Sequence, residues 1–342
     1  MRKPIVCCRN MKHVNMKNRL VIFLGGFLIL GFVACQSPTE KPEIVIVPEE
    51  HIHPKTGVWV TILGTVQDGG SPHAGCKKAC CKDLFLHPDP TRKVVSLGVV
   101  DFSAEKKFLF EATPDIATQM HYLKNTLPYE TPETPDGIFL THAHIGHYTG
   151  LMHLGREVLG ADSVPVYAMP KMKRFLVENG PWSQLVSLNN IVLLPIQNDS
   201  VIELTKQLRV EPFTVPHRDE FSETVGYKIS GGKKTLLFIP DINKWSIWEK
   251  DIIDEIEKVD YVLIDATFYD ANEVSRDISE IPHPFVVESM ELFKNLHESE
   301  KRKIIFIHFN HTNPLINPLS KEADFVRKSG FDVANFGMQI AL

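Results

Sequence analysis

Cysteine is scarce in this sequence, and its distribution argues against a disulfide framework. Of six cysteines in 342 residues, three lie at positions 7, 8 and 35, within or at the end of a hydrophobic leader. The other three, Cys76, Cys80 and Cys81, form one tight cluster. An odd, clustered trio is poor material for disulfide bonds, and ligation of a metal ion explains it better. Two alternatives stay open: thiols that are merely buried, and one disulfide joining Cys76 to Cys80 or to Cys81.

Positive charge is also in short supply once the leader is set aside. Six of the 37 lysines and arginines lie in residues 1–34, which contain no acidic residue. Beyond the leader there are 31 lysines and arginines and 42 acidic residues, so the net charge of that part is −11. Binding to a nucleic-acid backbone depends on cationic contacts with phosphates. This balance argues against nucleic acid as a partner, and we expect a small-molecule substrate instead.

A long hydrophobic run is missing, because the apolar stretch at residues 20–34 has only fifteen residues and is too short to span a bilayer comfortably. It follows the basic leader and ends at Phe32-Val33-Ala34-Cys35, which resembles the cleavage box of bacterial lipoproteins. We therefore expect a signal peptide at 1–34, a lipid anchor on Cys35, a flexible tether at 35–56 and a folded domain at 57–342. The resemblance also favours the outer membrane where the source has two membranes. An uncleaved anchor or a buried helix is the alternative.

Short β-rich runs and helical stretches share the rest of the chain. The early strands follow one another, whereas the later ones alternate with helices of apolar period near 3.6, which predicts two sheets flanked by helices in one α/β body. The expected strands are 58–63, 94–100, 107–111, 137–141, 164–168, 191–194, 208–213, 225–230, 235–239, 261–264 and 304–308. The expected helices are 115–124, 150–159, 171–179, 242–258, 284–296 and 319–329.

Three histidines follow the expected strand at 137–141 within a few residues. His142, His144 and His147 belong to the segment GIFLTHAHIGHYTGL at 137–151. Imidazole is the commonest neutral metal ligand, and spacings of two and three residues in a loop after a strand aim several rings into one cavity. A single histidine is usually structural, but three in such a loop predict a metal site.

This segment resembles the T-H-x-H-x-D-H-x-x-G signature of the metallo-β-lactamase superfamily, with Gly146 in place of the aspartate. Further segments match the superfamily pattern in order. The resemblance covers about residues 58–342 and implies a four-layer αββα sandwich. It also implies a metal site with a bridging aspartate, and an aspartate of the first motif that braces the histidine loop. The implied residues are His142, His144, His147, His217, Asp241 and His308 as ligands, Asp241 also as a catalytic residue, and Asp115 as the brace.

The segment LGTVQDGGSP at 63–72, followed by cysteines, narrows the resemblance. It is similar to the branch that holds pyrroloquinoline-quinone biosynthesis protein B and the cyclic phosphodiesterase of phosphonate breakdown. Relatives there carry a structural zinc on an N-terminal cysteine cluster, which implies a site of Cys76, Cys81 and His311 completed by Cys80 or His73. We expect Cys80. The resemblance also suggests that His283 acts near the leaving group.

Glycine at position 146 sets an expectation about metal content. The first metal keeps His142, His144, His217 and Asp241, whereas the second keeps only His147, Asp241 and His308. We therefore expect one firmly held active-site metal, with the second site weak or vacant, and tighter binding of a second ion in a Gly146→Asp variant.

Three interpretations of the function remain. The first is an exported, lipid-anchored hydrolase that cleaves a phosphodiester, ester or lactone with a metal-activated water. The second is oxygen-dependent or quinone-related chemistry at iron, since two histidines and a carboxylate with open positions suit iron(II). The third is a metal-binding lipoprotein without catalysis. Zinc is the expected metal, one or two ions at the active site and one structural ion, with manganese or iron as alternatives.

Overall fold

The computed structural model describes residues 55–273 and 281–342, which belong to one compact unit. The expected signal peptide, the lipidation site Cys35 and nearly all of the expected tether lie outside the described residues. Within the described ranges, no helix combines the length and apolar character needed to cross a membrane.

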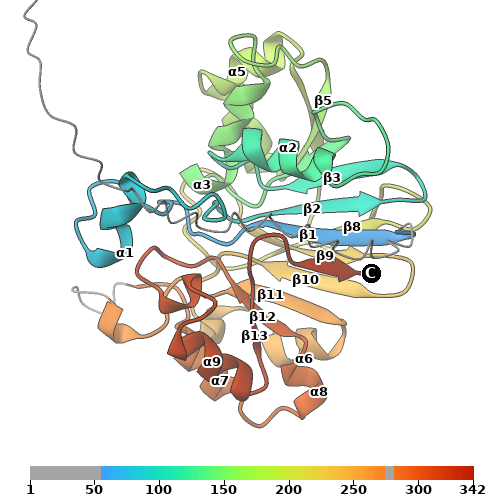
Figure 1. Ribbon diagram of the computed structural model, residues 1–342. Coiled ribbons are helices and arrows are strands. Elements are labelled where there is room, and N and C mark those ends of the chain that lie inside the picture. The colour runs from blue at the N-terminus through green and yellow to red at the C-terminus, as the bar shows by residue number, and fades with distance from the viewer. Residues whose placement is uncertain (1–54, 274–280) are drawn as a thin grey trace, which may run out of the picture. The chain divides into compact units, whose positions relative to one another are not determined.

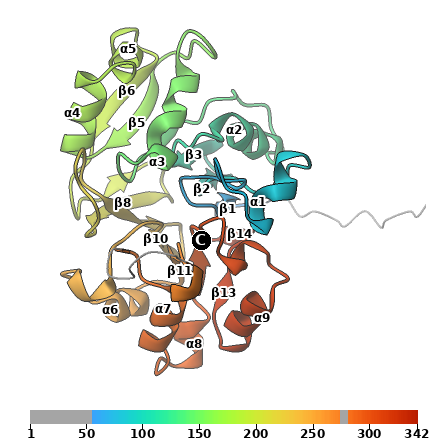
Figure 2. The ribbon, with the colours of Figure 1, turned by 90° about the vertical axis from the view of Figure 1, so that its left-hand side faces the viewer.

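Two mixed sheets of seven strands stack against each other, with helices on both outer faces (Figures 1 and 2). This is the predicted four-layer arrangement. The first sheet has the order β14-β1-β2-β3-β4-β5-β6, and the second has the order β13-β12-β11-β10-β9-β8-β7. The strands are β1 Val58–Gly64, β2 Ser96–Asp101, β3 Lys106–Phe110, β4 Gly137–Phe139, β5 Val164–Ala168, β6 Ile191–Pro195, β7 Ile202–Glu203, β8 Arg209–Thr214, β9 Val225–Ser230, β10 Thr235–Ile239, β11 Tyr261–Asp265, β12 Ile304–Ile307, β13 Asp332–Val333 and β14 Gln339–Ala341.

Alternating side chains in the strands build the core on both faces of each sheet. In β3, Phe108 and Phe110 enter the core between the sheets, and Leu109 enters the core under the helices. In β10, Leu236 faces the other sheet and Leu237 faces the helices of its own half. Successive strand residues point to opposite faces, so a strand covered on both sides must be apolar throughout. The continuous apolar runs in the sequence follow from this arrangement.

Helices cover each sheet through amphipathic faces. In α2, Ile116, Met120 and Leu123 lie one turn apart and pack on the first sheet, and in α9, Ala323 and Val326 pack on the second. The helices are α1 Ala79–Lys82, α2 Ile116–Asn125, α3 Ile145–Tyr148, α4 Pro170–Glu178, α5 Trp182–Ser187, α6 Ile252–Glu257, α7 Val286–Leu292, α8 Glu298–Lys301 and α9 Lys321–Lys328, with 3₁₀ turns η1 Asp83–Phe85, η2 Thr149–Leu154, η3 Trp245–Ile247, η4 Ala271–Glu273 and η6 Pro314–Ile316.

Two expected helices are wrong in extent. The stretch at 242–258 is a loop and a 3₁₀ turn followed by the short α6, because the carboxylate of Asp251 accepts a hydrogen bond from Ile253 N–H and so caps the helix at that point. The stretch at 150–159 is the 3₁₀ turn η2, which ends before Gly155. Gly150, the second residue of η2, donates its N–H to the carbonyl of Ala112, at 2.8 Å, instead of to a helical partner.

The topology gathers the candidate residues at one edge of the two sheets. In the first sheet β1, β3 and β4 run in one direction, since β2 is antiparallel to both β1 and β3. In the second sheet β8, β10, β11 and β12 likewise share a direction. The loops that leave the carboxyl ends of these strands carry the histidines and aspartates. Val66 pairs with Phe309 in a parallel bridge, so the loop after β1 lies against the segment after β12.

Candidate metal centre

The histidine loop begins where β4 ends at Phe139. His142 and His144 lie in the loop, and His147 lies on the short helix α3 that follows. His142 and His147 are almost fully buried. Nε2 of His142 and Nδ1 of His144 lie 2.8 Å apart, so these two rings converge on one point.

Two further side chains complete this first cluster. His217 follows β8, and its Nε2 lies 3.3 Å from Nδ1 of His144. Asp241 follows β10, and its Oδ2 lies 3.1 Å from Nε2 of His217 and 3.3 Å from Nε2 of His142. All four ligand atoms lie within 4.8 Å of one another. Three imidazoles and one carboxylate are a donor set that zinc accepts. The residues that the sequence predicted for the first metal therefore fit a zinc ion.

A second cluster shares Asp241 and contains an aspartate that the sequence did not predict. Its members are Asp68, His147, Asp241 and His308, again within 4.8 Å. Oδ1 of Asp68 lies 2.8 Å from Nε2 of His147 and 3.4 Å from Nε2 of His308. The sequence left three ligand-type side chains at this position, and the structure adds a fourth, because Asp68 reaches it from the loop after β1. A lone aspartate in a Gly-rich loop directly after a buried strand was the available signal.

The outward nitrogen of three cluster histidines has a hydrogen-bond partner of its own. Nδ1 of His142 lies 2.9 Å from the hydroxyl of Thr141, and Nδ1 of His308 lies 2.9 Å from that of Thr267. The carbonyl oxygen of the Asn243 side chain lies 3.1 Å from Nδ1 of His217. Such partners fix the tautomer and the ring orientation, and they leave the opposite nitrogen to face the metal position.

Glu111, at the end of β3, occupies the position next to the histidine loop that we assigned to Asp115. Its Oε1 lies 3.2 Å from Nδ1 of His147, and it is fully buried with a left-handed φ of 77°. The carboxylate of Asp115 instead accepts a hydrogen bond from the backbone N–H of Val94, at 2.8 Å. The prediction that Asp115 braces the histidine loop is corrected, because its carboxylate contacts Val94 and Lys93, just before β2.

His283 lies beside both clusters, as the sequence suggested. Its Nδ1 is 2.8 Å from Oδ2 of Asp265 and 3.2 Å from Oδ1 of Asp241. Asp265, at the end of β11, also accepts hydrogen bonds from the N–H of Ile242 and from Thr267. Asp265 was not singled out from the sequence, although it ends a continuous apolar strand, and it holds His283 against the bridging aspartate.

Among the cluster residues, His142 and Asp68 have pKa values shifted toward the states that bind a metal. Burial, together with the nearby His147, lowers the pKa of His142 well below its ordinary value. Burial opposes ionisation of Asp68, but His147 and His308 hold the pKa of its carboxyl well below the usual range. The imidazole of His142 is thus neutral and the carboxylate of Asp68 ionised, the states in which each binds a metal.

Burial opposes protonation of His147 and His308, but Asp68 and Glu111 raise the pKa of His147 well above its ordinary value, and Asp265 and Asp68 raise that of His308 to about 9. Burial likewise opposes protonation of His283, yet Asp265 and Asp241 outweigh it and raise the pKa to about 10.

A third cluster consists of the three cysteines and His311. Cys76, Cys80, Cys81 and His311 place their ligand atoms within 4.8 Å of one another, and the three cysteines are free thiols. The ring of His73 stacks on His311 with centroids 4.4 Å apart, and its Nδ1 lies 2.9 Å from the carbonyl of Ala74. The structure thus places Cys80, and not His73, as the fourth member beside Cys76, Cys81 and His311.

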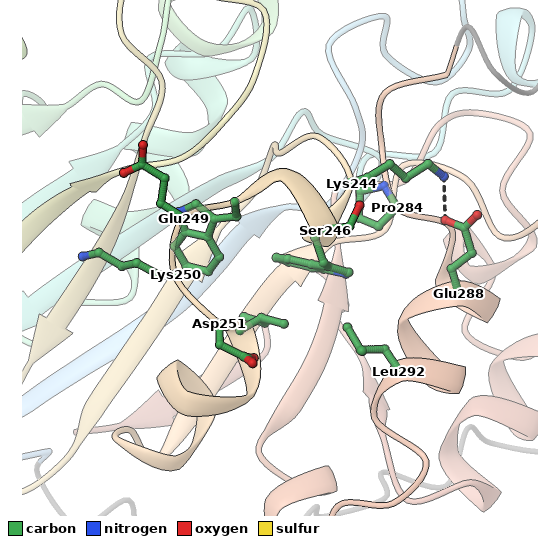
Figure 3. Close-up of a pocket in the computed structure, with 11 residues that line it drawn as sticks. Lys244, Ser246, Glu249, Lys250, Asp251, Pro284, Glu288 and Leu292 are labelled. Carbon is green, nitrogen blue, oxygen red and sulfur yellow. Dashed lines mark hydrogen bonds and ion pairs between the residues drawn. The ribbon is translucent and has the colours of Figure 1, made fainter.

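A cavity of about 410 Å³ opens beside the clusters. It is lined by Gln67, Arg218, Thr267, Phe268, Pro282, His283 and Asn310. A different cavity of about 580 Å³ lies between η3 and α7, where Lys244 and Glu288 form an ion pair of 2.6 Å (Figure 3). No residue of the three clusters lines that second cavity. The smaller cavity, which contains His283, is therefore the candidate substrate pocket.

Comparisons with known proteins agree with this architecture. The model of the beta-lactamase superfamily domain matches residues 106–309. Coenzyme PQQ synthesis protein B from Xanthomonas axonopodis pv. citri is 24% identical over 309 residues, covering 83% of this chain and 99% of the relative. The crystal structure of Zn²⁺-bound PqqB from Methylobacterium extorquens superposes with a TM-score of 0.69 at 23% identity, covering 83% of this chain and 100% of the other. A diphosphatase from the PhnP family gives 0.55 at 22% identity, with 83% and 97% covered.

Proposed function

Because the chain belongs to the beta-lactamase superfamily, we propose that it is a metal-dependent hydrolase and that its substrate is a phosphodiester. One observation carries the proposal: two clusters of ligand-type side chains share the carboxylate of Asp241 beside a cavity lined by His283 and Arg218. Bound ions at such clusters supply Lewis acidity and a nucleophilic water at neutral pH. The proposed ligands are His142, His144 and His217 on one side, His147 and His308 on the other, and Asp241 between them.

Residues of the chain have separate tasks in this proposal. Asp241 holds the two clusters together through Oδ2, and its Oδ1 faces His283. Because Nδ1 of His283 is engaged by Asp265, its Nε2 is the atom left to give a proton to the departing oxygen. Hydrogen-bond partners on the outward nitrogens of His142, His217 and His308 orient these ligand rings.

Charge in the pocket favours an anionic substrate over a neutral ester or lactone. Arg218 follows the ligand His217, is exposed, and lines the same cavity as His283. Arginine is suited to paired contacts with phosphate oxygens. The PhnP-family structure is described as a diphosphatase, and this description supports phosphorus chemistry as a proposal for the present chain.

The experiment compares chromogenic substrates on metal-free full-length protein reloaded with zinc, manganese or iron(II). We expect hydrolysis of a phosphodiester, with slower or no turnover of a phosphomonoester, a carboxylic ester and a lactone. His142→Ala should lose one bound ion and nearly all activity, whereas His121→Ala, an exposed histidine on α2, should retain both. Hydrolysis by the metal-free protein, or by His142→Ala at the wild-type rate, would contradict the proposal.

A second candidate function is a role in the synthesis of coenzyme PQQ, which the similarity to its synthesis protein B over 99% of that relative favours. In that case iron(II) and oxygen chemistry take the place of hydrolysis. Metal content after expression without added zinc separates the two candidates. Iron in the first cluster, together with oxygen consumption, supports the second, and zinc with phosphodiester hydrolysis supports the first.

We also propose that the enzyme is exported and attached to a membrane through lipid on Cys35, with residues 35–56 as a tether to the domain at 57–342. The basic leader, the short apolar run and the cysteine at its end support this. In bacteria labelled with a fatty acid, wild-type protein should carry label in the membrane fraction, and Cys35→Ala should carry none. Acyl label that persists in Cys35→Ala contradicts the lipid anchor.

A further inference from the structure

We propose that Asp68 is a ligand of the second metal position and that it replaces, from a different part of the chain, the carboxylate that the signature places at position 146. The inference rests on the proposed function in one respect, namely that the shared site binds metal. It goes beyond that function because it assigns two ions to the site and a role to a residue outside the signature.

Asp68 has the position and surroundings of a ligand. Its Oδ1 faces Nε2 of both His147 and His308, at 2.8 and 3.4 Å, and its side chain is 11% exposed. The oxygen of Asp241 that belongs to the first cluster lies 3.9 Å from Nε2 of His147. Four donor atoms thus surround one point, two of them carboxylate oxygens and two imidazole nitrogens. This is a complete tetrahedral set for a divalent ion.

Gly146 explains why the exchange of ligands is possible. A Cβ atom at position 146 would lie 2.5 Å from Cα of Asp68 and 2.8 Å from its Cγ. Real Cβ atoms do not approach backbone atoms so closely, so any side chain at 146 displaces the loop that carries Asp68. A carboxylate at 146 and a carboxylate at 68 exclude each other, which reverses our expectation that Gly146→Asp tightens binding of a second ion.

Backbone hydrogen bonds hold the Asp68 loop next to His308. The N–H of Phe309 donates to the carbonyl of Thr65 at 2.7 Å, and the N–H of Gln67 donates to the carbonyl of Phe309 at 2.8 Å. Phe309 is adjacent to His308, and Gln67 is adjacent to Asp68. Asp68 is therefore placed by the same strand-like pairing that places His308, without dependence on the side chains of the histidine loop.

The test is a zinc titration of the full-length protein in detergent, with bound zinc counted by elemental analysis. Asp68→Asn keeps the size of the side chain and removes its charge. It should hold one zinc fewer than wild type, and the affinity for that ion should fall by more than about 100-fold, since loss of outer partners alone costs about 10- to 100-fold. The double variant Asp68→Asn/His147→Ala should lose no more than that one zinc. Asp324→Asn, which removes an exposed carboxylate on α9, is the matched control and should bind as wild type.

Gly146→Ala provides an independent test, because it removes no ligand and yet should lose the same ion by displacing the Asp68 loop. Thermal unfolding of the metal-free variants shows that each one folds. A wild-type protein that holds no zinc at His142 or His147 contradicts the proposed function itself. Two results would overturn the role of Asp68: wild-type zinc content in Asp68→Asn, or a single active-site ion in the wild type. Neither result would contradict the proposed function.

Discussion

At the scale of single residues, Glu111 shows how the fold retains strain for the sake of a ligand. A non-glycine residue with a left-handed φ costs about 1–3 kcal/mol and persists where the surroundings demand it. Glu111 has a φ of 77°, is completely buried, and places one carboxylate oxygen 3.2 Å from Nδ1 of His147. Its other oxygen lies 3.5 Å from the N–H of Thr141. The side chain therefore positions both ends of the histidine loop.

Glu111→Gln should weaken the second metal position while it leaves the first intact. The amide has the size of the carboxylate but carries no charge beside Nδ1 of His147, which lies 3.2 Å from the Glu111 carboxylate, so the affinity for the second zinc should fall by about 10- to 100-fold. Stepwise zinc titration separates the two ions. Asp115→Asn is the control: it weakens the hydrogen bond to Val94 and should lower stability without any change in zinc affinity. Equal loss of both ions in Glu111→Gln would contradict this assignment.

At the scale of elements, the sequence predicted the strands well and the helices less well. The expected strands at 164–168, 225–230 and 235–239 match β5, β9 and β10 at both ends. A strand buried on both faces must be apolar throughout, so its limits are visible as limits of the apolar run. Helix limits depend on caps such as Asp251, which are single residues, and the expected helix at 242–258 accordingly failed.

Long-range pairing limited what the sequence could show of the site. The residues of the first cluster lie in motifs with recognisable spacing, and the structure brings them together. Asp68 lies beside His308, 240 positions away, because a β-bridge joins Val66 to Phe309, and no local pattern encodes that pairing. The strand β14 pairs with β1 in the same non-local way and was not expected. Glu111 was missed because its role depends on a backbone conformation rather than on its neighbours in sequence.

The cysteine cluster gives a prediction for the loop between β1 and β2. Cys81 is fully buried and belongs to the third cluster, so a metal there joins this loop to the segment after β12. Cys81→Ser should release one zinc and lower the melting temperature by several degrees, since structural zinc sites contribute directly to folding. The zinc of the first cluster should stay bound. A reductant alone should leave the melting temperature of the wild type unchanged, and a decrease would support a disulfide in place of the metal.

At the scale of the whole molecule, the clusters connect the two halves of the sandwich. His142 and His147 follow β4 of the first sheet, whereas His217, Asp241 and His308 follow strands of the second. The halves also share a core in which Phe110 packs against Tyr227 with ring centroids 5.2 Å apart. Ions bound at this edge would therefore have ligands from both sheets, which also pack against each other through the apolar core.

Removal of metal should therefore lower the stability of the domain as one unit. An ion that binds only the folded state stabilises it by about 4 kcal/mol at a free concentration of about 1,000 times its Kd. In domains of about 150–250 residues, 1 kcal/mol shifts the melting temperature by about 2–4 °C, so chelation should lower it by roughly 8–16 °C per tightly bound ion. Calorimetry with and without a chelator should show a single transition that moves, because both sheets lose the same link and keep the same core. His142→Ala should already have a lowered melting temperature and respond less to the chelator than wild type. A separate early transition, with the main one unmoved, would mean that the ions stabilise the loops alone and do not connect the sheets.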